Sequence, residues 1–287
     1  MEIFLQAVVN GILLGGFYSL MGMGQNIIFG VMNIVNFCHG EMLMVGMYLT
    51  YILYTYVGMD PYLAVPVVAI IMFGLGALIQ VTLITPSLKT KSFTNLLFLT
   101  VGLGLLLSNG ALVIFGSTYY KITTSYSQTY IPIGPITIAL PRLISFLVLI
   151  VVAIALFVFL KYTRTGKQIR AVSQNPVGAE VVGINVKKIY VLTYGLGIAL
   201  AGIAGSLLTQ FYTIYPTAGS SFGFRALIVV VVGGLGSIPG AFFAGIFLGL
   251  LEQMVALFIS PSYSDLIVFA TFIVILVIRQ IIILRRK

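Results

Sequence analysis

Residues 143–160 have the sequence LISFLVLIVVAIALFVFL, in which Ser145 is the one polar residue. As a helix, an apolar stretch of about 20 residues is long enough to cross the roughly 30 Å hydrocarbon core of a membrane. The whole 287-residue chain has a similar character, since 60% of its residues are hydrophobic and only 7% are charged. So few charged residues cannot cover the surface of a soluble protein of this size. This composition excludes a soluble enzyme and a nucleic-acid-binding domain.

We therefore predict an all-α polytopic membrane protein with a single transmembrane domain over residues 1–287. The full-length apolar segments predict about eight transmembrane helices, at 5–24, 41–57, 62–84, 95–115, 143–160, 189–211, 241–258 and 266–284. Two further apolar pieces, Ile27–Phe37 and Ala226–Leu235, are too short or too broken to span on their own. Glycines at helical spacing, such as Gly11 and Gly15, predict helices that pack closely in lipid.

The basic residues predict the orientation of the chain in the membrane. Twelve of the 15 fall in three regions that the predicted crossings place on one side: Lys89, Lys91, Lys161, Arg164, Lys167, Arg170, Lys187, Lys188, Arg279, Arg285, Arg286 and Lys287. By the positive-inside rule this side is the cytoplasm, which predicts a cytoplasmic C-terminus and an N-terminus outside. The segment 116–141, in which Lys121 is the one charged residue, is then an outward-facing loop with extended structure.

Residues 30–41, with the sequence GVMNIVNFCHGE, lie between two apolar segments yet contain Asn33, Asn36, His39 and Glu41. Such polar groups are costly in hydrocarbon unless they are satisfied, so they should face protein or water. Two explanations stay open for the asparagines: they line a pathway through the membrane, or they cap and hold a broken helix. For the ionisable pair we favour the pathway, because ionisable residues inside a membrane usually have a function.

Residues 232–241, with the sequence VGGLGSIPGA, form a second interruption. Four glycines and a proline within eight residues cannot continue a helix. Paired interruptions of this kind in the two halves of a membrane protein indicate a transport site near the midplane. The predicted pathway residues here are Gly233, Gly234, Gly236, Ser237 and Pro239. Glu252 lies inside a predicted span, where we expect it to pair with a neighbouring group.

The predicted cytoplasmic loop 161–188 contains a capped helical motif. Asn175 suits the N-cap, Pro176 the first helical position and Gly183 the left-handed position after the end, which predicts a helix over Pro176–Val182. A seven-residue helix with several valines is marginal alone in water and suits a groove in another protein. The predicted docking residues are Asn175, Pro176, Ala179, Glu180 and Gly183. The alternative is a helix folded back onto the ends of the bundle.

The chain lacks the motifs of an ATP-hydrolysing or metal-dependent enzyme. Gly166-Lys167-Gln168 has neither the preceding glycine nor the hydroxyl residue of a phosphate-binding loop. With one cysteine, Cys38, and one histidine, the sequence predicts neither an internal disulfide nor a metal cluster. We therefore expect a non-catalytic chain without a cofactor or metal of its own.

Three segments resemble one known family. Residues 33–41, NIVNFCHGE, are similar to the Ile-Asn-Phe-Ala-His-Gly-Glu signature of LivH-type permeases of the high-affinity branched-chain amino acid ABC importers, with Cys38 in place of Ala. Residues 233–241 look like the Gly-Gly-x-Gly-Ser-x-x-Gly-Ala element of that family, and residues 170–185 look like its cytoplasmic loop. The resemblance runs over almost the whole chain in the same order and is weakest over 116–141.

The resemblance implies a subunit that moves leucine, isoleucine and valine across a bacterial inner membrane. It implies a second, LivM-like permease, two cytoplasmic LivG/LivF-like ATPases that bind ATP and Mg²⁺, and an extracytoplasmic solute-binding protein. The predicted helix Pro176–Val182 would then couple this chain to the ATPases. Similar permeases carry urea, short amides or other amino acids, so the substrate stays open. The alternatives are an ion-gradient-driven transporter with His39 and Glu41 as a proton relay, and a purely structural membrane scaffold.

Overall fold

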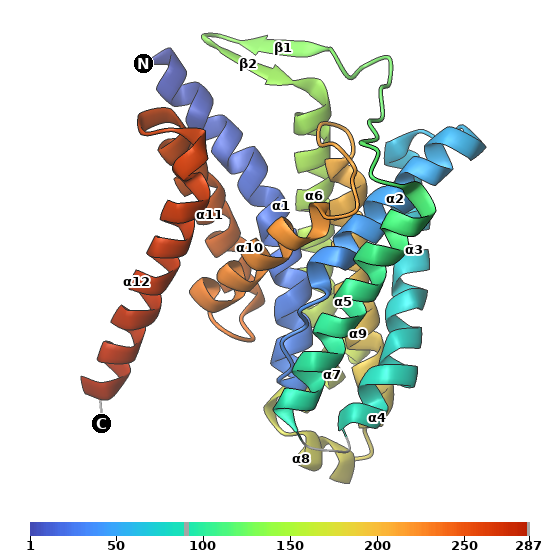
Figure 1. Ribbon diagram of the computed structural model, residues 1–287. Coiled ribbons are helices and arrows are strands. Elements are labelled where there is room, and N and C mark those ends of the chain that lie inside the picture. The colour runs from blue at the N-terminus through green and yellow to red at the C-terminus, as the bar shows by residue number, and fades with distance from the viewer. Residues whose placement is uncertain (89–91, 286–287) are drawn as a thin grey trace.

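The computed structural model describes residues 1–88 and 92–285, which are almost entirely helical (Figure 1). In chain order the helices are α1 (Glu2–Met32), α2 (His39–Val57), α3 (Pro61–Ile79), α4 (Thr85–Leu88), α5 (Phe93–Phe115), α6 (Leu140–Tyr162), α7 (Arg164–Gln174), α8 (Pro176–Val181), α9 (Val186–Leu208), α10 (Ala218–Gly233), α11 (Ile238–Phe258) and α12 (Ser264–Arg285). A π-helical turn (Gln80–Ile84) joins α3 to α4, and a 3-10 turn (Pro261–Tyr263) precedes α12. The strands β1 (Tyr130–Ile133) and β2 (Ile136–Ala139) form an antiparallel hairpin.

Within the described ranges, seven helical segments are long and apolar enough to cross a membrane. They are Glu2–Met32, Pro61–Leu88, Phe93–Phe115, Leu140–Tyr162, Val186–Leu208, Ile238–Phe258 and Pro261–Ile278. These seven correspond to seven of the predicted spans and confirm the all-α polytopic class. The remaining predicted span, 41–57, is present as the 19-residue helix α2. Its four tyrosines, together with His39 and Glu41, make it less apolar than the other seven.

The predicted limits of the two short pieces are wrong at their N-terminal ends. Helix α1 continues through residues 27–32, so the first break covers only residues 33–38. Gly30 is tolerated inside this helix, and its small size lets the backbone of Gly236 approach, because a Cβ atom there would lie 3.0 Å from Gly236 Cα. Helix α10 begins at Ala218 rather than Ala226. The polar residue Arg225 can lie inside this helix because Glu252 and Asp265 neutralise its charge.

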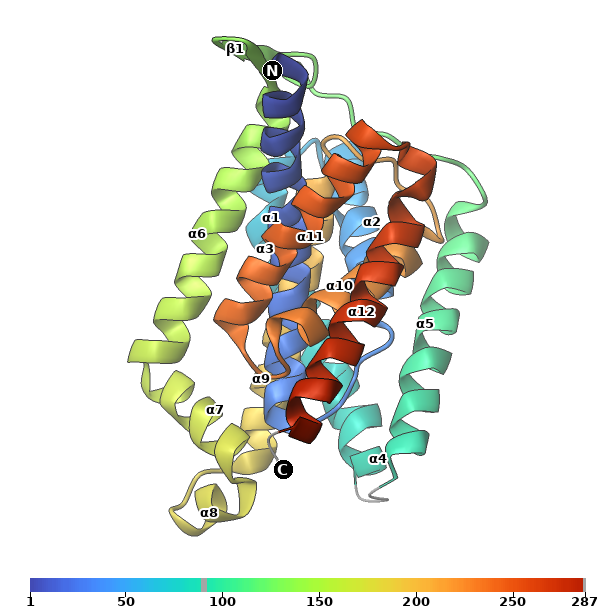
Figure 2. The same cartoon turned by 90° about the vertical axis from the view of Figure 1, so that its left-hand side faces the viewer.

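The chain ends and the polar segments divide between two opposite ends of the molecule. The N-terminus and the β hairpin lie at one end, whereas α7, α8 and the end of α12 lie at the other (Figures 1 and 2). Six of the basic residues used for orientation lie between α6 and the start of α9, at the α7–α8 end: Lys161, Arg164, Lys167, Arg170, Lys187 and Lys188. Lys89, Lys91, Arg286 and Lys287 lie outside the described residues.

The predicted extended segment 116–141 is anchored to the helices beneath it. The Tyr126 hydroxyl donates a hydrogen bond to Asp60 Oδ2 at 2.7 Å, and Asp60 Oδ1 accepts one from the Tyr62 N–H at 2.9 Å at the start of α3. Burial raises the pKa of Tyr126, so its hydroxyl keeps the proton that it donates. Backbone hydrogen bonds between Tyr120 and Ile214, both 2.9 Å long, fix a second point of the loop.

Helix α9 is the most buried of the seven candidate spans, and α1 packs against it and along α11. The α1–α11 packing depends on the glycines predicted for it. A Cβ atom at Gly15 would lie 2.7 Å from Ile246 Cα, and one at Gly11 would lie 2.9 Å from Leu250 Cα. Small residues allow such close approach where packing, rather than the hydrophobic effect, joins helices. Large apolar side chains on α5, α6 and α12 are exposed, so lipid or other subunits must cover them.

Candidate functional site

The first break begins with a helix cap. Asn33 adopts a left-handed conformation (φ 53°), and its N–H donates a hydrogen bond to the Phe29 carbonyl at 2.8 Å. Asparagine is one of the few residues that adopts this conformation without a large penalty. Its side chain is exposed at the end of α1. The structure therefore gives Asn33 a capping position, one of the two explanations that the sequence left open.

The interior of this break is buried and only partly hydrogen-bonded. Asn36 Oδ1 accepts a hydrogen bond from Cys38 Sγ at 3.0 Å, and the Asn36 side chain is 1% exposed. Within the described residues, Asn36 Nδ2 has no hydrogen-bond partner. A buried amide with one unsatisfied group lowers the stability of the folded state. This break therefore contains a polar group that does not stabilise the fold.

His39 and Glu41 point in different directions. The His39 ring is buried against α1, with Nε2 3.2 Å from the Met21 carbonyl oxygen. Gly24 leaves room for this ring, since a Cβ atom there would lie 3.1 Å from His39 Nε2. Residues two apart in a helix do not share a face, so the Glu41 side chain leaves α2 on another side. The structure does not bring the two ionisable groups together.

Glu41 lines a cavity of about 340 Å³ between the start of α2, α5 and the first half of α10. The lining residues are Phe37, Glu41, Val101, Gly104, Leu105, Ser108, Thr217, Ser220, Gly223, Phe224 and Leu227. Gly104 makes space for the carboxylate, because a Cβ atom there would lie 3.3 Å from Glu41 Oε2. In the part of the chain that the structure describes, Glu41 has no salt-bridge partner. An unpaired carboxylate beside apolar walls and hydroxyl groups can hold a cationic or N–H-donating group.

The second break is held by a residue of α1. Asn26 Nδ2 donates hydrogen bonds to the carbonyl oxygens of Gly234 (3.0 Å) and Ser237 (2.7 Å), and Asn26 Oδ1 accepts one from the Gly236 N–H (2.6 Å). These three bonds satisfy backbone groups that the interrupted helix leaves free. Positive φ angles at Gly234 (93°) and Gly236 (83°) make the turn possible.

The helix that follows this turn is capped at its start. Ser237 Oγ accepts a hydrogen bond from the Gly240 N–H at 3.2 Å, and Pro239 occupies the first turn of α11. Gly233 ends α10 and lies against Gly240, with which it makes a close backbone contact. The predicted glycines and proline therefore build a closed turn.

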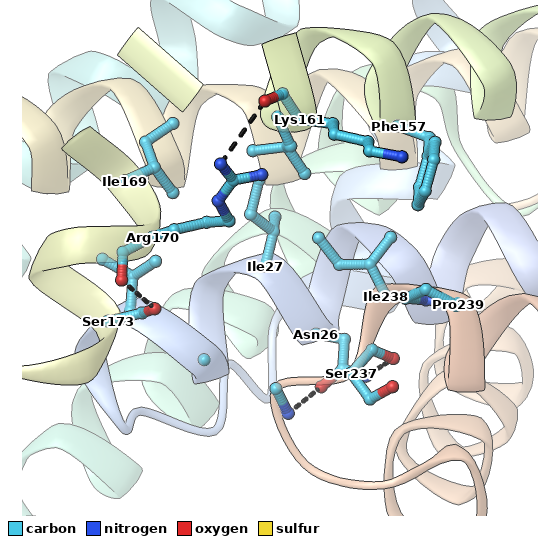
Figure 3. A pocket seen from close by; sticks show the side chains of 14 residues that line it. Asn26, Ile27, Phe157, Lys161, Ile169, Arg170, Ser173, Ser237, Ile238 and Pro239 are labelled. Atoms are coloured by element: carbon cyan, nitrogen blue, oxygen red, sulfur yellow. Dashed lines mark hydrogen bonds between the residues drawn. The ribbon is translucent and has the colours of Figure 1, made fainter. Parts of the chain in front are cut away.

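This turn borders a second cavity, of about 350 Å³, beside α1, α6 and α7 (Figure 3). Gly236, Ser237 and Pro239 line it together with Asn26, Ile27, Gly30, Val31, Phe157, Leu160, Lys161, Ile169, Arg170, Ser173 and Ile238. Glu41 is not part of this lining. Glu41 and the second-break residues Gly236, Ser237 and Pro239 therefore line different cavities, and neither cavity is lined by the other predicted pathway residues, Asn33, Asn36, His39, Gly233 and Gly234.

An ion-pair network lies between α10, α11 and α12. Arg225 Nε is 3.2 Å from Glu252 Oε2, a second guanidinium nitrogen is 2.5 Å from Asp265 Oδ1, and the Tyr18 hydroxyl donates to Glu252 Oε2 at 2.7 Å. The predicted pairing of Glu252 is confirmed. Neither Arg225 nor Asn26 was predicted from the sequence. Both could have been singled out, because a polar side chain in an apolar helix needs a buried partner. Arg225 stands alone beside an apolar piece, and Asn26 lies inside an apolar helix.

Helix α8 has the predicted caps at both ends. Asn175 Oδ1 accepts a hydrogen bond from the Gly178 N–H at 2.9 Å, and Pro176 is the first helical residue. At the other end Gly183 has a φ of 83°, which glycine adopts without strain, and its N–H donates to the Glu180 carbonyl at 3.0 Å. Ala179 is buried, whereas Glu180 and the three valines of the motif are exposed.

Comparison with known proteins identifies the family. Residues 7–276 match the family described as branched-chain amino acid transport system / permease component. The chain belongs to this permease family. Both breaks and α8 lie within the matched residues.

The permease is similar to curated relatives along nearly its full length. It is 31% identical to the high-affinity branched-chain amino acid transport system permease protein LivH of Salmonella typhimurium, covering 96% of this chain and 93% of that protein. It is 29% identical to BraD, the permease protein of the same kind of transport system in Pseudomonas aeruginosa, covering 96% and 94%. The ribose import permease protein RbsC of Escherichia coli is 33% identical over 45% of this chain and 42% of its own. No solved structure matches the chain.

Proposed function

We propose that this permease is a membrane-spanning subunit of an ABC importer that moves branched-chain amino acids with ATP hydrolysed by separate subunits. The observation that carries this proposal is the full-length similarity to LivH and BraD, whose names specify branched-chain amino acid transport. Leucine, isoleucine and valine are the expected cargo. Urea, short amides and other amino acids remain the alternatives within the same class of importer.

The geometry of α8 supports a docking role toward two cytoplasmic ATPases. The side chains of Val177, Val181 and Val182 are 71%, 83% and 74% exposed, so the helix presents an apolar surface outward. Capping at both ends gives it a defined shape before it meets a partner, which lowers the ordering cost of binding. ATP and Mg²⁺ would bind the ATPases, and this chain would transmit their movement through α8.

The distribution of charge supports an orientation. The six basic residues of loop 161–188 lie at the α7–α8 end, which we assign to the cytoplasm by the positive-inside rule. The hairpin end then faces outward, with the N-terminus, where an extracytoplasmic solute-binding protein would dock. A second permease subunit would cover part of the exposed apolar surface.

The Glu41 cavity is the part of the predicted pathway that we assign to translocation. It offers one unpaired carboxylate, hydroxyl groups and apolar walls, a combination that suits an amino acid with an ammonium group and an aliphatic side chain. The ion-gradient alternative needs His39 and Glu41 to exchange a proton, and the two side chains face different helices. This separation supports the ATP-driven importer.

Purification from native membranes tests the class of transporter. A gently extracted, tagged chain should bring with it two ATPases with phosphate-binding loops and a second permease of similar size. Reconstituted with a solute-binding protein, this assembly should take up leucine in proteoliposomes when ATP is present. A chain that comes out alone under crosslinking, and that takes up leucine on an ion gradient without ATP, would contradict the proposal.

Two substitutions test the coupling role of α8. Gly183→Pro forbids the positive φ and removes the N–H bonded to Glu180, and Glu180→Lys reverses an exposed charge. Both variants should keep assembly and ATP hydrolysis but lower leucine uptake per ATP at least tenfold. Gly58→Pro, at a positive-φ glycine that follows α2 near the opposite end, is the matched control and should leave coupling unchanged. Wild-type uptake in both α8 variants would contradict the assignment.

A further inference from the structure

The cavity beside the second break has basic and apolar walls that the transport function does not use. Arg170 of α7 and Lys161 at the end of α6 lie at one rim, and Asn26 and Ser237 lie at the opposite side (Figure 3). Ile27, Phe157 and Ile238 supply the apolar surface between them. The site therefore joins positive charge to an apolar interior at the α7–α8 end of the membrane helices.

Both basic groups are available to a ligand. The salt bridges among the described residues all involve Arg225, so Arg170 and Lys161 have no carboxylate partner there. One guanidinium nitrogen of Arg170 donates a 3.4 Å hydrogen bond to the Lys161 carbonyl, and its other N–H groups donate no hydrogen bond within the described ranges. The Lys161 ammonium lies 5.8 Å from the centre of the Phe157 ring. Both side chains are exposed at the rim of the cavity.

A second, entirely apolar cavity adjoins the first. It has a volume of about 200 Å³ and shares Phe157, Ile238 and Pro239 with the basic cavity. Its other lining residues are Met23, Ile150, Ala153, Ile154, Phe242 and Phe243. It lies between α6 and α11 at a greater distance from the end of α6, so the polarity falls from the basic rim toward the membrane interior.

We propose that this pair of cavities is a binding site for an anionic phospholipid of the leaflet on the α7–α8 side. The headgroup phosphate lies between Arg170 and Lys161, and one acyl chain occupies the apolar groove between α6 and α11. Basic pockets between transmembrane helices at the cytoplasmic surface are suited to anionic headgroups, and the adjoining groove distinguishes a lipid from a free anion. The proposal uses the assigned orientation only to name the leaflet.

A lipid in this position contacts α7 and the start of α11. Arg170 and Ser173 belong to α7, which leads directly into α8, and Ser237 and Pro239 begin α11. The bound lipid therefore links the loop that carries α8 to the turn held by Asn26.

Native mass spectrometry of the assembled transporter tests the site. The complex is equilibrated with equal amounts of phosphatidylglycerol and phosphatidylcholine that carry the same acyl chains, and the retained lipids are counted. The wild-type complex should retain at least threefold more phosphatidylglycerol than phosphatidylcholine. Lys161→Gln with Arg170→Gln should bring this ratio close to one. Ile154→Trp, at an exposed position in the groove, should lower the retention of both lipids at least threefold.

The matched control removes the same charge elsewhere in the loop. Lys187→Gln with Lys188→Gln changes two exposed basic residues that do not line the cavity and should leave the ratio unchanged. An equal loss in this control would contradict a defined site. Unchanged retention in the Lys161/Arg170 pair would also overturn the proposal. Displacement by inorganic phosphate, with no effect of Ile154→Trp, would reassign the site to a free anion.

Discussion

The two interrupted segments of this permease have similar sequence signatures but opposite hydrogen-bond balance. At residues 234–237 the side chain of Asn26 satisfies three backbone groups of the turn. At residues 33–38 and the first residue of α2, the structure leaves Asn36 Nδ2 and His39 Nδ1 without partners among the described residues. The carboxylate of Glu41, just beyond this break, has no salt-bridge partner there either.

We interpret this difference as one between a break that holds the fold and a break that serves transport. A glycine turn inside a membrane is stable when a neighbouring helix supplies hydrogen bonds, and Asn26 does so for the second break. Polar groups that remain open at the first break reduce stability, and of these we expect Glu41, which faces a cavity, to serve transport. The comparison predicts losses of folding from changes near the second break and losses of transport from a change at Glu41.

Asn26→Ala should have the largest effect on stability. It removes three partly buried hydrogen bonds, and each backbone group left unsatisfied costs about 1–3 kcal/mol, so we expect the free energy of unfolding to fall by about 3–9 kcal/mol. Denaturant unfolding of the purified complex measures this. Asn109→Ala is the control and should change it by less than about 0.5 kcal/mol, because the Asn109 amide is exposed and donates to the Leu105 carbonyl of its own helix. Equal stability of the two variants would contradict the role of Asn26.

His39→Ala should be next in size and should affect folding more than transport. The buried ring loses its contact with the Met21 carbonyl and leaves a cavity against α1, which should cost about 2–4 kcal/mol. Membrane abundance and leucine uptake should therefore fall in the same proportion. Normal abundance with lost uptake would instead place His39 in the pathway, as its sequence position suggested.

Glu41→Gln should lower transport without lowering abundance. The substitution keeps the shape and removes only the charge that faces the cavity, so uptake per transporter should fall at least tenfold, equivalent to about 1.4 kcal/mol in the transport barrier. Uptake and complex abundance are measured on the same membranes. Glu2→Gln, an exposed glutamate in the first turn of α1, serves as control. A fall in abundance that accounts for all the lost uptake would sink the functional assignment.

Substitutions at Asn33 should have the smallest effect and report only on the cap of α1. Asn33→Gly adopts a φ of 53° freely and should change stability by less than about 1 kcal/mol, whereas Asn33→Val should lower it by about 1–2 kcal/mol. Thermal unfolding of both purified complexes distinguishes them. Identical melting of the two variants would show that the left-handed cap contributes nothing.

The spans and the capped helix could be predicted because local sequence determines them. Apolar length sets the membrane helices, and the residues Asn175, Pro176 and Gly183 specify the two ends of α8 without help from distant segments. The start of the first break was misplaced because Gly30 is compatible with a helix, and its role is to admit the backbone of Gly236. The C-terminal end of α1 therefore depends on a contact between residues that are far apart in the sequence, which the local sequence does not show.

The arrangement of the site was harder to predict for the same reason. Asn26 is bonded to residues more than 200 positions away, and Arg225 is paired with acids on two other helices. A single sequence indicates that Asn26 and Arg225 need buried partners, but it does not indicate which distant residues those partners are. The separation of His39 from Glu41, by contrast, follows from helical periodicity, since residues two apart face different sides. Helical periodicity at the start of α2 therefore predicts that His39 and Glu41 cannot both face the same cavity.

The most direct test of this account is leucine uptake per assembled transporter, measured in ATP-loaded proteoliposomes that contain equal amounts of complex. The account predicts that Glu41→Gln falls at least tenfold below the wild type. It predicts that the Asn26→Ala complexes that do assemble transport within twofold of the wild type, because Asn26 holds the fold and Glu41 serves the cargo. Wild-type uptake by Glu41→Gln, or a tenfold loss per complex in Asn26→Ala, would contradict this division of roles between the two breaks.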